Sequence, residues 1–153
     1  MGRKACSPDT GAMQKDGHVI IRVFEWDDED RVADLWRACG LVVSQNDPRK
    51  DMKLKMDFQP DLFLVGETAG QIAASVMAGY EGHRGWINYL AVHPEYRRQG
   101  LGRRMMSEAE DRLKSLGCVK INLQVRETNT EVIDFYKRLG YTLDCVVSLG
   151  KRF

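Results

Sequence analysis

The chain alternates between apolar and polar positions with two different periods. Apolar residues recur at helical spacing in two stretches, at Val32, Leu35, Trp36 and Cys39 and again at Leu101, Met105, Met106, Ala109, Leu113 and Leu116. Compact apolar runs bounded by turn residues instead predict strands. These runs cover residues 18–24, 62–67, 72–78, 86–92, 119–125 and 145–149.

Capping residues predict where the helices begin and end. Asp27 or Asp28 is expected to cap the first helix, and Gly40 to end it. Pro48 opens a second helix, whose lysines are expected to face water. Its predicted core positions are Met52, Leu54, Met56 and Phe58.

Glycine and polar residues also punctuate the second half of the chain. Thr128-x-x-Glu131 predicts a capping box at the start of the last helix. Ala69-Gly70 predicts a hairpin turn between two strands. Gly117 and Gly140 follow helical segments, at positions where a left-handed residue is expected.

The predicted order of elements is β-α-α-β-β-β-α-β-α-β, an α/β arrangement in which a mixed sheet carries helices on both faces. One domain is expected over residues 18–153. Residues 1–17 mix Gly, Ser, Pro, Lys and Asp without periodicity, which predicts a disordered N-terminal arm.

Composition narrows the class of partner. The chain has 153 residues with 23 Lys+Arg and 22 Asp+Glu, so its net charge of +1 gives no electrostatic reason to expect nucleic acid or a membrane surface. No apolar run approaches the ~18 residues of a membrane span, and the first residues lack the apolar region of a secretory signal, so we expect a cytoplasmic protein. The four cysteines lack C-x-x-C spacing, which favours reduced thiols over disulfides or a metal site; Cys6 is expected to be exposed.

The segment at residues 92–104, Val-His-Pro-Glu-Tyr-Arg-Arg-Gln-Gly-Leu-Gly-Arg-Arg, joins a strand to a helix through glycines and arginines. Free N–H groups and the helix dipole make a helix N-terminus attractive to phosphate, and Gly100 and Gly102 would let an anion approach closely. A G-x-x-x-x-G-K-[ST] loop is absent. A dinucleotide fingerprint would need a third glycine and an acidic residue about twenty positions on, where arginines stand instead.

A second segment begins with Asn129 and closes in Leu-Gly-Tyr at Tyr141. Together, and in this order, the two segments resemble the signatures of the GNAT family of N-acetyltransferases, and the chain is identified as a small single-domain member of bacterial type. The resemblance implies the GNAT fold, in which the two central strands splay apart. It also implies acetyl-coenzyme A as acetyl donor and no metal.

By this resemblance, backbone groups of Leu90 and Val92 would bind the pantetheine amides, and the pyrophosphate would rest on N–H groups from Arg98 to Arg103. The implied cofactor-binding residues are Leu90, Ala91, Val92, Arg97, Arg98, Gln99, Gly100, Leu101, Gly102, Arg103, Asn129, Phe135 and Tyr136. Tyr136 would be catalytic, protonating the departing thiolate. A purely structural core tyrosine, and a solvated basic face for the arginines, are the alternatives.

The general base is not evident from the resemblance. Family members that acetylate histones, and others that acetylate a ribosomal protein, use glutamates where this chain has Trp86 and Gln124. The remaining candidates are Glu67, Glu81, His83 and Glu127, of which we select Glu81 as catalytic because it lies in the turn expected beside the acceptor. Each has an ordinary surface role as the alternative.

The predicted activity is therefore transfer of an acetyl group from acetyl-coenzyme A to a primary amine, by direct attack in a ternary complex. The acceptor is a small-molecule or peptide amine whose identity the sequence leaves open. The sequence also leaves open whether the protein forms a homodimer. A non-catalytic module that binds or senses acyl-coenzyme A is the alternative, favoured by the missing glutamates and disfavoured by Tyr136.

Overall fold

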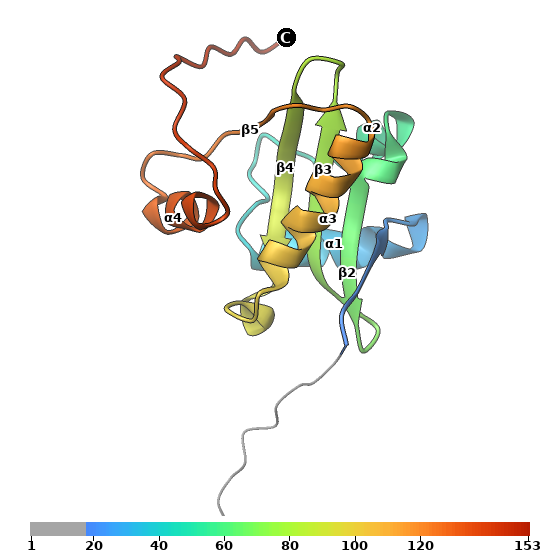
Figure 1. Cartoon of the computed structure of the whole chain (residues 1–153). Helices are drawn as coiled ribbons and strands as arrows, with labels where there is room; N and C mark the ends of the chain where they lie inside the picture. The colour runs from blue at the N-terminus through green and yellow to red at the C-terminus, as the bar shows by residue number, and fades with distance from the viewer. Residues whose placement is uncertain (1–17) are drawn as a thin grey trace, which may run out of the picture.

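The computed structural model describes residues 18–153, which form one five-stranded sheet flanked by helices (Figure 1). The strands follow chain order across the sheet; the first three pairings are antiparallel and the last is parallel. The strands are β1 (Ile20–Val23), β2 (Phe63–Thr68), β3 (Gln71–Tyr80), β4 (Gly85–Val92) and β5 (Ile121–Leu123). The helices are α1 (Glu29–Ala38), α2 (Pro48–Asp57), α3 (Leu101–Ser115) and α4 (Thr130–Arg138), with short 3-10 turns η1 (Trp26–Asp28), η2 (Pro60–Leu62) and η3 (Pro94–Tyr96).

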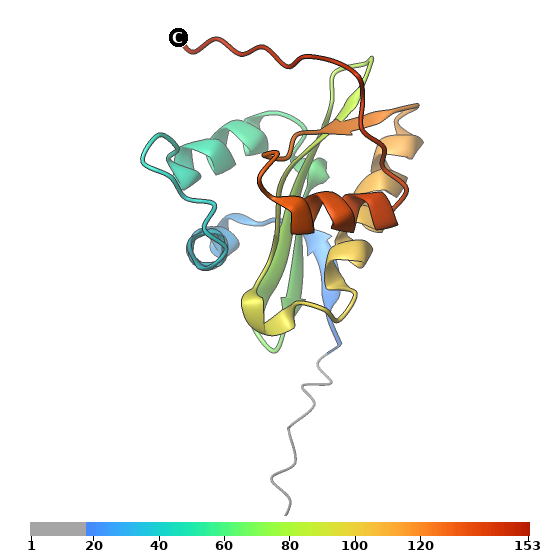
Figure 2. The same cartoon turned by 90° about the vertical axis from the view of Figure 1, so that its left-hand side faces the viewer.

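Helices cover both faces of the sheet, as predicted (Figure 2). Trp36 of α1 and Met52 of α2 are fully buried against one face, beside Phe63 of β2. Met105 and Leu113 of α3 are fully buried against the other. The helices α1 and α3 present the apolar sides that their sequence periods indicated, and the sheet is held between two apolar layers.

The predicted closing strand is wrong. Residues 145–149 form no strand, and Val146, Val147 and Leu149 are at least three-quarters exposed. The segment is attached through a side chain to the residue that follows β5, since Gln124 Nε2 donates to Ser148 Oγ at 2.5 Å. Valine-rich sequence has high β-propensity only where it packs on a half-buried surface, and these residues have no such surface in the described chain.

The predicted apolar stripe of α2 is also wrong. Met52 is fully buried, but Leu54 and Phe58 are 57% and 59% exposed, because residues two positions apart lie on different sides of a helix. Lys55, expected to face water, is instead half-buried and donates from Nζ to the Ala78 carbonyl oxygen.

Two predicted caps differ in detail. Asp28 stands at the N-cap of α1, yet its carboxylate makes no cap bond to that helix and instead accepts from Arg22 and Arg31. The last helix is capped by Asn129, whose side chain accepts from Val132 N at 3.4 Å, rather than by Thr128.

The remaining predictions concern the N-terminal arm, the cysteines, membrane-spanning segments and metal sites. The predicted arm and Cys6 lie outside the described residues. Within residues 18–153, Cys39, Cys118 and Cys145 are free thiols. In this same stretch, no helix has the length and apolar character needed to cross a bilayer, and no three His, Cys, Asp or Glu side chains gather as a metal-binding group.

Candidate active site

β4 and β5 pair over only three residues before they separate. The pairs run from Gly85 with Ile121 to Ile87 with Leu123. Beyond that point β4 continues along β3 as far as Val92, but within residues 18–153 it has no strand on its other side. Leu90, Ala91 and Val92, all predicted cofactor contacts, therefore lie on what we call the open edge of β4, residues 88–92. Free backbone groups at such an edge can bind an extended amide-bearing ligand.

A β-bulge shapes this edge. Ser75 is opposite Ala91 and Met77 is opposite Asn88, so Tyr89 and Leu90 together face a single residue of β3. Tyr89 has φ +51°, which is uncommon for a residue with a bulky side chain.

The bulge is held in place from the α1 side. The Ser75 hydroxyl donates to the Tyr89 carbonyl oxygen at 3.2 Å and accepts from Trp36 Nε1 at 2.8 Å. The rings of Trp36 and Tyr89 stack with centroids 4.0 Å apart. Because strained backbone persists only where its surroundings fix it, the buried Trp36–Ser75 pair accounts for the conformation of Tyr89.

The loop before α3 has the geometry of an anion site. Arg98 and Gly100 have φ +59° and +78°, while Gln99 between them has no positive φ. Such alternation turns successive N–H groups toward one point. Backbone N–H groups of Arg98 to Arg103 have no acceptor among the described residues, and the first bond of the helix is Arg104 N to Gly100 O at 3.1 Å. The first turn of α3 carries no carboxylate, so this helix N-terminus is free to receive phosphate.

The three arginines predicted to contact the cofactor, Arg97, Arg98 and Arg103, differ in their hydrogen-bond and ion-pair partners. Arg97 Nε donates to the Val92 carbonyl oxygen at 3.0 Å and so ties the loop to the open edge. Arg98 is exposed and pairs with Glu131 of α4 at 3.1 Å. Arg103 makes no hydrogen bond or ion pair within the described chain, and its guanidinium is available to a ligand. Leu101 is 4% exposed and anchors the start of α3 in the core.

The two glycines are not equivalent. A Cβ at Gly100 would meet no atom within 4 Å, so the space beside it is open. A Cβ at Gly102 would lie 3.2 Å from Cζ of Phe135 and 3.6 Å from Cγ2 of Val92. Gly102 therefore lets α4 pack closely on α3 at the open edge, and the two sequence segments meet in space.

Tyr136, the predicted proton donor, lies on α4 next to this contact. Its side chain is 8% exposed, and its ring packs at an angle to those of Phe135 and Tyr141. Burial raises the pKa of Tyr136 to about 12. The hydroxyl has no hydrogen-bond partner within residues 18–153, where no polar side-chain atom is buried without one; it therefore stays accessible. The ring of Tyr136 therefore packs in the core, while its hydroxyl has no hydrogen bond to residues 18–153.

The predicted base candidates lie elsewhere. Glu81 and His83 belong to the β3–β4 turn, at the opposite end of β4 from the α3 N-terminus (Figure 1). Both oxygens of Glu81 accept backbone N–H groups, from His83 at 2.8 Å and Arg84 at 2.6 Å. Glu67 pairs with Arg22 and Arg31 near the far edge of the sheet. Glu127 is exposed after β5.

Sequence reasoning missed a polar cluster on the α2 side of the open edge. Tyr89 OH donates to Asp51 Oδ2 at 2.5 Å, and Asn46 Nδ2 donates to the same hydroxyl at 3.4 Å. Burial, followed by the hydrogen bond to Asp51, raises the pKa of Tyr89 to about 12. Asp51 is a polar residue of α2 that no sequence motif singles out, and only the fold brings it next to β4.

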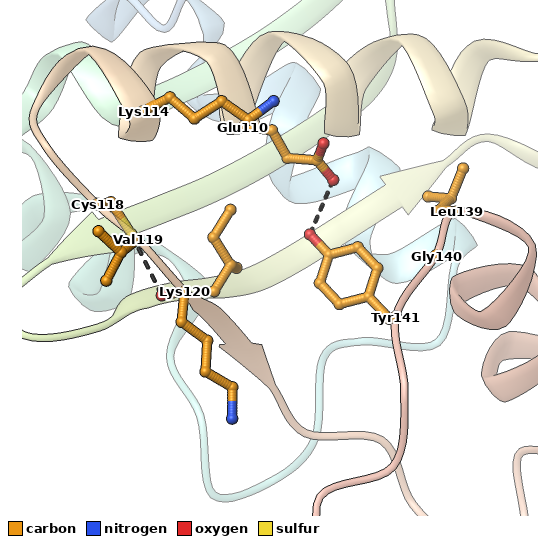
Figure 3. Close-up of a pocket in the computed structure, with 9 residues that line it drawn as sticks. Glu110, Lys114, Cys118, Val119, Lys120, Leu139, Gly140 and Tyr141 are labelled. Carbon is orange, nitrogen blue, oxygen red and sulfur yellow. Dashed lines mark hydrogen bonds between the residues drawn. The ribbon is translucent and has the colours of Figure 1, made fainter.

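A hollow of about 230 Å³ lies between the C-terminal half of α3 and the chain after α4 (Figure 3). Tyr141 OH points toward Glu110 and donates to it at 2.9 Å. The two lysines at its rim, Lys114 and Lys120, pair with Asp111 and Asp144. Its charged groups thus have partners in the protein. Of the two signature segments only the closing Leu139, Gly140 and Tyr141 line it, and none of the predicted cofactor-binding residues does.

Comparison with known proteins agrees with this geometry. Residues 21–141 match a family model described as acetyltransferase (GNAT) family. An acetyltransferase of Sodalis glossinidius is 48% identical over 133 residues, which cover 86% of this chain and 94% of that protein. Ard1 from Thermoplasma volcanium has a similar fold, with TM-score 0.71 and 21% identity over 83% of this chain and 84% of that one. An aminoglycoside N-acetyltransferase, AAC(6')-Iy in complex with CoA, gives TM-score 0.72 and 15% identity over 92% and 99%.

Proposed function

Since the chain belongs to the GNAT family of acetyltransferases, we propose that it transfers the acetyl group of acetyl-coenzyme A to a primary amine of a small molecule or peptide. The observation that carries this proposal is the run of unpaired N–H groups at the start of α3, which lies directly beside the open edge of β4. One end of the site is built for phosphate and the other for an extended amide chain.

The residues present fit coenzyme A. N–H groups from Arg98 to Arg103 would hold the pyrophosphate, with the open space beside Gly100 admitting its oxygens. The open edge at Leu90 and Val92 would bind the pantetheine amides. Bound in this way, the donor would supply an activated acetyl thioester. The CoA complex of a protein with the same fold supports this assignment.

The proposed work of the protein residues is to position and protonate. A backbone N–H of the open edge would polarise the acetyl carbonyl, since a fixed donor in a dry site stabilises developing negative charge. Tyr136 would give its proton to the departing sulfur, because its raised pKa keeps the phenol protonated at neutral pH and its hydroxyl is free. Asn129 would contact the pantetheine while capping α4, and Phe135 would line the site beside Gly102.

Glu81 is the base that the sequence indicates. Its two backbone hydrogen bonds hold its carboxylate in the β3–β4 turn, so any proton it received from the acceptor would have to travel through water. Reduced thiols at Cys39, Cys118 and Cys145 fit the cytoplasmic location proposed for the enzyme.

Thiol release from acetyl-coenzyme A, measured against a panel of amines, tests the proposed function. The expected result is release that requires both protein and amine, with the acetylated amine identified by mass spectrometry. Calorimetry with coenzyme A runs alongside. Coenzyme A binding without thiol release for any amine would favour the non-catalytic sensor, and absence of binding would contradict the cofactor assignment.

A further inference from the structure

Asp51 of α2 is the carboxylate that the fold brings to the open edge of β4, and the sequence did not indicate it. We propose that Asp51 binds the ammonium group of the acceptor and takes its proton, an inference that rests on the proposed amine acetylation. The site would thus select a cationic primary amine and activate it on the α2 side of the sheet.

The geometry rests on hydrogen bonds between three elements. Asp51 Oδ2 accepts from Tyr89 OH at 2.5 Å, and Tyr89 is the bulged residue of the open edge. Asn46, in the loop before α2, donates to the same hydroxyl at 3.4 Å, so the phenol proton is directed at Asp51. The half-buried carboxylate is therefore one side chain away from the strand that would bind the acetyl donor.

The cationic side chains near Asp51 are bound to other groups. Asp51 forms no ion pair with any residue from 18 to 153. Nearby on α2, Arg49 is paired with Glu29 and Asp30 around α1, and Lys55 is bonded to the Ala78 carbonyl. Tyr89 and Asn46, which contact the cluster from β4 and the loop, are neutral at pH 7. A substrate ammonium would supply the charge-assisted hydrogen bond that the second carboxylate oxygen lacks.

Other carboxylates are less suited to this role. Glu81 has both oxygens bonded to backbone N–H groups at the far end of β4. Glu67 is held by two arginines near the other edge of the sheet. Asp51 alone among these three has both an unoccupied oxygen and a direct contact with the open edge.

The proton balance of the transfer is as follows. The acceptor enters as an ammonium and gives one proton to Asp51, which passes it to solvent. The nitrogen lone pair forms the new C–N bond as the C–S bond breaks. The nitrogen then loses its second proton to solvent, while Tyr136 protonates the sulfur and recovers its own proton from water. The sum is one amide, one thiol and one released proton.

The test compares Asp51→Asn with Asp51→Glu and with the control Asp57→Asn, which changes an exposed carboxylate on the same helix. Asp51→Asn should lower kcat/KM for the amine by about 10²–10⁴-fold, the usual contribution of acid–base catalysis. Its kcat/KM should rise about tenfold per pH unit up to the pKa of the acceptor, whereas the wild type should be flat near neutral pH. Asp51→Glu should recover part of the loss, Asp57→Asn should match wild type, and coenzyme A affinity should stay within twofold.

Three results would overturn the proposal. The first is Asp51→Asn with wild-type kcat/KM and an unchanged pH profile. The second is an equal loss in the Asn and Glu variants accompanied by weaker coenzyme A binding, which indicates a structural role for the Tyr89 contact. The third is a loss confined to Glu81→Gln. A protein that releases thiol with neutral and cationic amines alike refutes the ammonium site and leaves acetyl transfer intact, whereas failure of the wild type to bind or acetylate any amine counts against both.

Discussion

Lys55→Met should make the protein more stable at neutral pH. Lys55 is a half-buried residue of α2. Its Nζ donates to the Ala78 carbonyl oxygen, and it has no ion pair within residues 18–153. Burial lowers its pKa from 10.5 to about 8. Methionine fills a similar volume without a charge, so the variant removes an ammonium that folding takes out of water without a counter-ion.

The magnitude follows from the pKa. The difference between 10.5 and about 8 corresponds to roughly 3 kcal/mol of charge desolvation, since one pKa unit is 1.36 kcal/mol. Because the side chain is partly exposed, and the Ala78 carbonyl loses its donor at a cost of about 1 kcal/mol, the net gain should be about 1–2 kcal/mol.

The gain should depend on pH in a definite direction. Below about pH 8 Lys55 is charged in the folded and the unfolded chain, so the full desolvation cost is present. Between about 8 and 10.5 the folded protein has lost the proton while the unfolded chain retains it, and wild-type stability rises with pH. The advantage of Lys55→Met should therefore shrink over that window, vanish within it and reverse by about 1 kcal/mol near its upper end, where only the lost hydrogen bond to Ala78 counts.

Urea unfolding followed by tryptophan fluorescence, at intervals from pH 6.5 to 10, measures this difference. Lys53→Met is the matched control, because Lys53 is exposed and forms only an i,i+4 pair with Asp57, worth about 0.3–0.5 kcal/mol. A Lys55→Met advantage that stays constant from pH 7 to 10, or a destabilisation at pH 7, would refute the desolvated ammonium.

Three further predictions concern the site and the scaffold. Gly100→Val should weaken coenzyme A binding at least tenfold and also lower the melting temperature, because a β-branched residue is strained at φ +78°, and Gly102→Ala should lower both because its Cβ meets a ring of α4; calorimetry at a temperature where thermal melts show each variant to be folded measures the affinity. Tyr136→Phe should keep coenzyme A affinity and stability but slow turnover at least tenfold, and equal rates would make this residue purely structural. Asp28→Asn should cost roughly 3 kcal/mol in urea unfolding at pH 7, since it removes the buried carboxylate charge that accepts from Arg22 and Arg31, and the loss should diminish as pH falls below 4.

Local rules predicted much of the fold. Gly117 and Gly140 have φ +86° and +96° just past α3 and α4, and Ala69-Gly70 forms the β2–β3 turn with positive φ at both residues. Pro48 is the first residue of α2. These positions are decided by backbone stereochemistry over a few residues, which is why the sequence alone identifies them.

Tertiary contacts decided the parts that were not predicted. The segment 145–149 has strand-like residues but no strand beside it, and β-propensity cannot supply the missing partner. Lys55 is of a residue type that usually lies on the surface, yet its Nζ donates to the Ala78 carbonyl oxygen of β3. Asp51 gained its place only when α2 packed on the bulge of β4. Each depends on a contact between residues more than twenty positions apart.

Packing also explains why the two signature segments belong to one site. Phe135 of α4 fills the space that the absent side chain of Gly102 leaves on α3, and Arg98 of the loop pairs with Glu131 one turn earlier on α4. The helix that carries Tyr136 is therefore positioned by the same turn that would hold phosphate. Occupation of that turn restrains Arg98 and the first residues of α3, and through them the orientation of α4. Phosphate binding and placement of the Tyr136 hydroxyl should consequently be coupled, although no hydrogen bond joins them directly.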